Sequence, residues 1–157
     1  QKIGFIFQDF RLFPEYTVRD NILIPFYLDH RTPDEQMLRK LTEILGIAEK
    51  LDARPSQISG GQQQRVAIAR ALIGKPRIVF ADEPTGNLDV ETGKAIVELL
   101  HNICESGSSV VMTTHNLQLL KEYPGRVYRC ADHQIVDVTA EYMLRQRTIE
   151  IDLNIDN

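Results

Sequence analysis

The sequence predicts an α/β fold with a parallel sheet, and three observations lead to that prediction. Residues 78–81 are four consecutive apolar residues followed by two carboxylates, Asp82 and Glu83. This pattern is typical of a buried parallel strand that carries acids to the C-terminal edge of a sheet. Two further β-rich apolar runs lie at residues 2–7 and 109–113. Segments of helical periodicity separate the runs, as an α/β arrangement requires.

The region after the first strand predicts two helices. Thr17 and Asp20 form a capping pattern before a short helix that we expect Pro25 to limit. Residues 32–35 combine a cap at Thr32, a proline at the first helical position and a glutamate three residues after the cap. An amphipathic helix follows, and Gly46 can close it. Its expected apolar face consists of Met37, Leu38, Leu41, Ile44 and Leu45.

The second half of the chain predicts two longer helices and a hairpin. An alanine-rich helix over residues 62–73 ends at a glycine and a proline. Asp89 can cap a helix over residues 90–106. The apolar face of that helix would hold Ala95, Ile96, Leu99, Leu100 and Ile103. Residues 127–138 suggest a hairpin with His133 in its turn, and a poorly ordered acidic tail is expected at the C-terminus.

Length and composition are those of a single globular domain. The chain has 157 residues, a hydrophobic content of 43% and a net charge of −4, which argues against nucleic acid as the main partner. The apolar stretch at residues 22–28 is far shorter than the roughly twenty residues of a membrane span. Cys104 and Cys130 lie in apolar segments, so we expect buried, reduced thiols. The start at Gln1, without methionine or a signal-peptide pattern, leads us to expect a fragment.

Two motifs predict a phosphate site and a metal site. Ser59-Gly60-Gly61-Gln62 opens a helix, where unpaired N–H groups and the positive end of the helix dipole favour an anion. We expect this anion site and the acidic strand end to lie at opposite ends of the molecule. The adjacent carboxylates of Asp82 and Glu83 suit a magnesium nucleotide.

These motifs, followed by Pro84 to Asp89 and by Thr113-Thr114-His115, resemble the signature motif, Walker B strand, D-loop and switch histidine of ATP-binding-cassette (ABC) ATPases. Phe7-Gln8 resembles the Q-loop of the same family, and the resemblance extends over residues 1–138. It implies a P-loop NTPase of the ABC type, with a RecA-like core and a helical subdomain, lacking its N-terminal part. The implied division is residues 1–9 for the end of a core strand and the Q-loop, 10–75 for the helical subdomain, 76–140 for the core and 141–157 for a polar tail.

The resemblance also implies a role for each residue of the site. Asp82 would hold Mg²⁺, Glu83 would be the general base, and Gln8 would sense the metal and the attacking water. His115 would bridge the γ-phosphate and a second subunit. Two subunits would sandwich ATP head to tail, so that Ser59, Gly60, Gly61 and Gln62 complete the site of the partner. Asp89 of the D-loop would cross the same interface.

One departure from the family pattern concerns the phosphate cradle. No Gly-x-x-x-x-Gly-Lys-Ser/Thr occurs in the 157 residues. We expect it to lie upstream of Gln1 in a longer protein. A sheet without its central strand exposes an unpaired edge, so the isolated chain should aggregate or bind ATP weakly.

Within the family, the run from Phe7 to Leu12 is similar to the branch that contains the cell-division (FtsE), lipoprotein-release and macrolide-efflux ATPases, and most similar to the cell-division members. This similarity implies an ATPase bound to the cytoplasmic face of the inner membrane, driving an FtsX-like membrane subunit, with no nucleic acid as partner. Lipoprotein release or efflux is the alternative with the same chemistry. A non-catalytic subunit that only lends its signature motif in trans is an alternative of another class, which the presence of Glu83 and His115 disfavours.

Overall fold

The computed structural model describes residues 3–86 and 88–142, and the chain divides into two compact units, residues 1–114 and 115–157. The first unit holds a parallel sheet with its helices, and the second holds a short helix and a hairpin. Within the described residues, no helix is long and apolar enough to cross a membrane.

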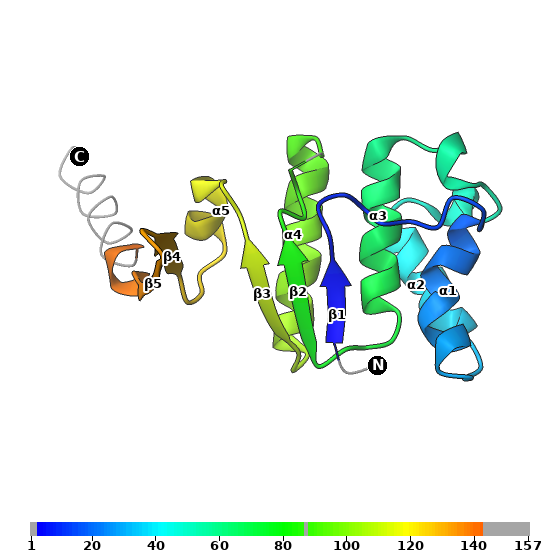
Figure 1. Cartoon of the computed structure of the whole chain (residues 1–157), viewed down its shortest axis with the longest axis horizontal. Coiled ribbons are helices and arrows are strands. Elements are labelled where there is room, and N and C mark those ends of the chain that lie inside the picture. Colours follow the sequence, from blue (N-terminus) through cyan, green and yellow to red (C-terminus); the bar gives the residue numbers. More distant parts are fainter. Residues whose placement is uncertain (1–2, 87, 143–157) are drawn as a thin grey trace, which may run out of the picture. The chain divides into compact units, whose positions relative to one another are not determined.

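The first unit is built on a parallel sheet, as the sequence predicts, with three strands in the order β1-β2-β3 (Figure 1). The strands are β1 (Ile3–Ile6), β2 (Ile78–Asp82) and β3 (Ser109–Thr113). In the register of the sheet, Asp82 of β2 is the partner of Thr113 of β3. The predicted acids therefore lie at the edge where the carboxyl ends of the strands meet.

One face of the sheet is covered by helices. α3 (Gly60–Leu72) contacts β1, and α4 (Val90–Glu105) contacts β3. Side chains alternate along a strand, and those that point toward the helices are buried. They include Ile6, Val79 and Ala81. A Cβ atom at Gly4 would lie 2.6 Å from the carbonyl oxygen of Ala71, so glycine allows α3 to lie directly against β1.

The opposite face of the sheet carries exposed apolar side chains. Phe5 is 47% exposed and Val111 is 53% exposed, and the rings of Phe5 and Phe80 stack with their centroids 5.1 Å apart. Both faces of a parallel sheet are normally covered. Among residues 3–86 and 88–142, β3 has a neighbouring strand on one side only. The expected open edge is thus observed, and the aggregation that we expect from it stays a prediction.

The helical part of the first unit surrounds α3. α1 (Val18–Leu28) and α2 (Glu35–Ile44) both contact α3 (Figure 1). Two 3-10 turns, η1 (Ala48–Lys50) and η2 (Pro55–Gln57), follow α2 and precede α3. Buried apolar residues of α1, of α2 and of the C-cap of α2 belong to the same core as the sheet: Val18, Ile22, Leu23, Phe26, Leu38, Leu41 and Leu45.

The prediction that Pro25 limits the first helix is wrong, because α1 continues through Pro25 to Leu28. A proline inside a helix removes one backbone hydrogen bond and costs about 3 kcal/mol. Burial of a large apolar side chain contributes about 1.5–3 kcal/mol. Ile22, Leu23 and Phe26 are all buried, so packing outweighs the proline.

The second helix begins two residues later than predicted. Asp34, not Thr32, is its N-cap, and the Asp34 carboxylate accepts a hydrogen bond of 2.9 Å from the N–H of Met37. Ile44 was expected on the apolar face but is 53% exposed. Gly46 follows the helix with φ +63, which confirms the predicted stop.

Both cysteines are exposed and free, so the prediction of buried thiols is wrong. Cys104 lies near the end of α4, a helix whose buried side is formed by Gly93, Ile96, Val97 and Leu100. Cys130 lies on a strand whose side chains are all exposed. Apolar neighbours in the sequence do not bury a residue that points away from the core.

The second unit contains α5 (Leu117–Glu122) and an antiparallel hairpin of β4 (Tyr128–Ala131) and β5 (Gln134–Asp137). The hairpin is confirmed, and His133 lies in its turn with φ +59. The predicted acidic tail lies beyond residue 142, outside the described residues.

Candidate functional site

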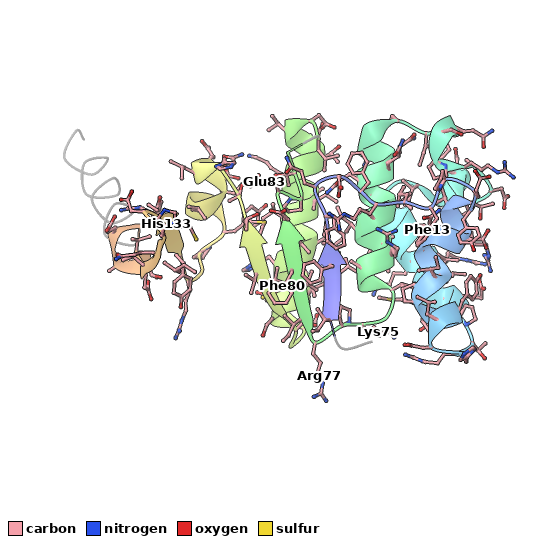
Figure 2. The ribbon with its side chains drawn as sticks, in the orientation of Figure 1. Phe13, Lys75, Arg77, Phe80, Glu83 and His133 are labelled. Carbon is pink, nitrogen blue, oxygen red and sulfur yellow. The ribbon has the colours of Figure 1, made fainter. Side chains whose placement is uncertain are left out.

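The carboxyl ends of β2 and β3 form the centre of the candidate site. The Thr113 hydroxyl donates a hydrogen bond of 2.6 Å to Oδ1 of Asp82. The same hydroxyl accepts a bond of 3.1 Å from the backbone N–H of Glu83. One hydroxyl on β3 therefore binds the Asp82 carboxylate and the backbone of Glu83 at the end of β2, where Figure 2 shows Glu83.

Glu83 has a left-handed backbone with φ +43, which a residue with a side chain rarely adopts. The strand ends there, and the chain turns through Pro84 toward Asp89. Such strain persists where surrounding contacts fix it, and the bond to Thr113 is one of them. The sequence analysis named Thr113 beside His115 but gave it no role, because its partners lie 30 and 31 residues away and only the sheet register pairs them.

Gln8 and Asp82 line the same cleft, and their predicted joint action on one metal stays a prediction. The cleft has a volume of about 500 Å³, and its walls are Phe7, Gln8, Asp9, Phe10, Arg11 and Asp82. An amide oxygen and a carboxylate are hard donors of the kind that Mg²⁺ prefers, with water and phosphate oxygens completing the shell. In the described part of the chain, no three His, Cys, Asp or Glu side chains are grouped to hold a metal by themselves. The donors present therefore fit a magnesium ion held jointly with a nucleotide.

The start of α3 is a complete capping box. The Ser59 hydroxyl accepts a hydrogen bond of 3.3 Å from the N–H of Gln62, and Gln62 Oε1 accepts one of 2.9 Å from the N–H of Ser59. The N–H groups of Gly60 and Gly61 belong to the first turn, which has no partners within the helix. Among residues 3–86 and 88–142, no atom beyond the adjacent residues and the backbone of α3 itself lies within 4 Å of the position where a Cβ of Gly60 would be. This open backbone fits the predicted approach of an anion.

The signature segment, residues 59–62, lies near the acidic end of β2. The expectation that the two lie at opposite ends of the molecule is therefore wrong. Gln64, two residues after the capping box, donates a hydrogen bond of 3.1 Å to the carbonyl of Pro84. A Cβ atom at Gly61 would lie 3.4 Å from Leu88. The reason is that α3 packs along β1 with its N-terminus at the edge where the strands end (Figure 1).

Asp89 is the N-cap of α4, as predicted. Its carboxylate accepts a hydrogen bond of 2.9 Å from the N–H of Thr92, and this bond is the main cause that lowers the pKa of Asp89. Its expected place at a subunit interface stays a prediction. His115 is the first residue of the second unit, so its role beside Asp82 and Glu83 also stays a prediction.

Known proteins resemble this chain in sequence. The profile of a family described as "ABC transporter" matches residues 1–86. The lipoprotein-releasing system ATP-binding protein LolD 2 of Caulobacter vibrioides is 42% identical, over 83% of this chain and 58% of its own length. The cell division ATP-binding protein FtsE of Mycobacterium tuberculosis is 39% identical, over 98% of this chain and 58% of its own length.

A solved structure also resembles the chain. It is the dimeric post-hydrolysis state of the ATP-binding cassette MJ0796 bound to ADP and Pi, which superposes with a TM-score of 0.74 at 39% identity, over 86% of this chain and 61% of that chain. The chain thus spans about three fifths of the length of the relatives that it matches. From the family profile, the relatives and the superposed fold together, we conclude that the chain belongs to the ABC transporter family and has the P-loop NTPase fold of its ATPase domain.

Proposed function

We propose that this chain is the ATP-binding and ATP-hydrolysing part of a subunit in a membrane ABC complex. The observation that carries the proposal is the Thr113 hydroxyl, which holds Asp82 and Glu83 together beside the cleft that Gln8 also lines. Both relatives are named as ATP-binding proteins, which supports it.

The proposed site residues divide the chemistry between them. Asp82 and Gln8 would hold magnesium, which, when bound, neutralises the charge of the β- and γ-phosphate oxygens. Glu83 would accept the proton of the attacking water as general base. His115 would reach the γ-phosphate and the second subunit.

The proposed active unit is a head-to-tail dimer with ATP between the subunits. Ser59, Gly60, Gly61 and Gln62 would bind the nucleotide of the partner through the open first turn of α3, and Asp89 would lie across the interface. The MJ0796 cassette, which is dimeric and bound to ADP and Pi, supports a dimer that binds nucleotide.

The phosphate cradle of the same subunit would come from residues outside the 157. The exposed sheet face around Phe5 and Val111 and the open side of β3 offer the surface on which further core elements would pack. The isolated chain should therefore aggregate or bind ATP weakly. A cooperative, soluble monomer with micromolar affinity for ATP would count against this part of the proposal.

The finer proposal is a role in cell division at the cytoplasmic face of the inner membrane, with an FtsX-like membrane subunit as partner. The run from Phe7 to Leu12 and the FtsE relative, which aligns over 98% of this chain, support it. The 42% identical lipoprotein-release protein supports lipoprotein release as the second candidate. Purification of the full-length protein from its own membranes distinguishes them, because each candidate predicts a different co-purifying membrane subunit.

The test of the catalytic proposal is Glu83→Gln in the full-length protein. Loss of a general base should lower turnover by about 10² to 10⁴ while ATP still binds and the dimer persists. Glu98→Gln is the matched control, because Glu98 is an exposed glutamate on α4 and should leave turnover unchanged. If Glu83→Gln retains the parent turnover, Glu83 is not the base. Absence of turnover in the full-length parent itself would instead favour the non-catalytic alternative.

A further inference from the structure

The loop that follows Gln8 has an unusual backbone. Phe10 has φ +60 and Arg11 has φ +46, and neither residue is glycine. Two consecutive left-handed residues with side chains are unfavourable in an isolated chain. Contacts with the rest of the protein must therefore hold this conformation.

The principal contact comes from Arg70, a residue of α3 to which sequence reasoning gave no role. Its Nη2 donates a hydrogen bond of 2.7 Å to the carbonyl of Phe10, and its Nη1 donates one of 2.6 Å to the carbonyl of Arg11. Consecutive residues of the same helical hand turn their carbonyls to the same side, so one planar guanidinium can bind both. Bonds from a cation are stronger than neutral ones.

The environment of Arg70 strengthens these bonds. The side chain is partly buried, and this burial lowers the pKa of the guanidinium without removing its charge at neutral pH. In a less polar environment, a charged donor binds a carbonyl more strongly than it does in water.

The opposite end of the loop is fixed by its own side chains. Arg11 Nε lies 3.0 Å from Oδ1 of Asp9, and the guanidinium stands 4.3 Å from the centre of the Phe7 ring. Gln8 lies between Phe7 and Asp9 in the sequence, so the position of its backbone follows from the conformation of this loop.

We infer that Arg70 is a positioning residue, which holds the left-handed turn at Phe10 and Arg11 and thereby places Gln8 in the cleft beside Asp82. The effect of Arg70 on catalysis rests on the proposed role of Gln8. The effect of Arg70 on the conformation of the loop does not. It also connects two motifs that are separate in the sequence, because α3 opens with Ser59 and the signature segment.

The first experiment measures the loop directly, by hydrogen exchange of the full-length protein in the segment 7–13. Arg70→Met keeps the length of the side chain and removes both donors, so exchange of the amides of Phe10 and Arg11 should rise about tenfold or more. Arg70→Lys keeps the charge but lacks the two-pronged geometry, so it should give a smaller rise. If Arg70→Met does not fold, Arg70→Lys serves as the test, and exchange of the amides of Phe10 and Arg11 should then rise about threefold.

Arg65→Met is the matched control. Arg65 is on the same helix, also partly buried, and binds the Leu45 carbonyl at 3.3 Å and the Thr92 hydroxyl at 3.0 Å. Its loss should leave exchange at Phe10 and Arg11 unchanged. The inference is overturned if the Arg70 variants exchange there at the parent rate, or if Arg65→Met raises exchange as much as Arg70→Met does.

The second experiment measures turnover against magnesium concentration. A misplaced Gln8 should raise the magnesium concentration for half-maximal turnover in Arg70→Met, and much less in Arg70→Lys. Gln8→Ala should give the same shift, and the double variant Gln8→Ala with Arg70→Met should add little to it. Fully additive effects would overturn action through Gln8. If Gln8→Ala alone changes nothing, the proposed role of Gln8 fails, while hydrogen exchange still judges Arg70.

Discussion

The Thr113 hydroxyl is the contact on which the proposed site depends most directly, and Thr113→Val tests it. Valine has nearly the same shape and the same preference for strands, so β3 should form as before. The variant removes the bond of 2.6 Å to Asp82 and the bond of 3.1 Å from the N–H of Glu83.

The size of the effect follows from these two bonds. A hydrogen bond to a charged group contributes about 1.5–3 kcal/mol, and a neutral one contributes about 0.5–1.5 kcal/mol. Thr113 and Asp82 are both exposed, so water replaces part of the loss. We therefore expect that the free energy with which the hydroxyl orients Asp82 and Glu83 falls by about 1–2 kcal/mol. This loss corresponds to a decrease of about 5- to 30-fold in kcat/KM.

The assay is steady-state ATP hydrolysis by the full-length protein, with thermal unfolding measured in parallel. Thr113→Ser is the control, because serine keeps the hydroxyl and should stay within about threefold of the parent. A Thr113→Val variant with parent kcat/KM and a parent magnesium requirement would refute the reasoning, since the hydroxyl would then not position the acids. A loss of activity in both variants would mean that the threonine methyl group is needed as well as the hydroxyl, because valine keeps that methyl group and serine lacks it.

Three further variants test the fold by unfolding of the full-length protein in urea. Gly4→Ala would place its Cβ 2.6 Å from the carbonyl oxygen of Ala71, so forcing β1 and α3 apart should lower the free energy of unfolding by about 1–3 kcal/mol. Asn21→Leu removes a fully buried amide that binds both the N–H and the carbonyl of Phe13, at 2.8 and 3.0 Å, and should cost about 2–4 kcal/mol because buried backbone groups lose their partners. Asp34→Asn keeps the cap of α2 but removes its charge. The pKa of Asp34 is lowered in the folded state, mainly by the N–H of Met37, so the advantage of aspartate should be present at neutral pH and vanish as the pH falls below about 4.

The elements that could be predicted from the sequence are those whose signals are local. Apolar runs predicted the three strands, and the caps at Ser59 and Asp89 predicted where α3 and α4 begin. A cap binds an N–H only two or three residues away, so the pattern contains both partners. The same local reasoning misplaced the start of α2, because Thr32 and Asp34 are both good caps and only the packing of the helix selects between them.

The features that could not be predicted depend on residues far apart in the sequence. The bonds of Arg70 join positions 59 and 60 residues apart, and nothing near Arg70 in the sequence indicates its partners. The prediction that Pro25 limits the first helix considered only the local cost of a proline. The burial of Phe26 and its neighbours, which outweighs that cost, is a property of the packed core. For the same reason, Cys104 appeared buried in the sequence and is exposed in the structure.

Helix α3 links these distant parts of the site. Gln64 binds the carbonyl of Pro84 just after the acidic pair, Arg65 binds Thr92 in the first turn of α4, and Arg70 binds the loop after Gln8. A helix of 13 residues moves as one body, because displacing one turn alone would break its internal hydrogen bonds. Any shift imposed on the first turn of α3, where the partner's nucleotide is proposed to bind, would therefore pull on the turn at Pro84, on the first turn of α4 and on the loop after Gln8. This arrangement provides a physical route by which one nucleotide site of the proposed dimer could report its state to the other.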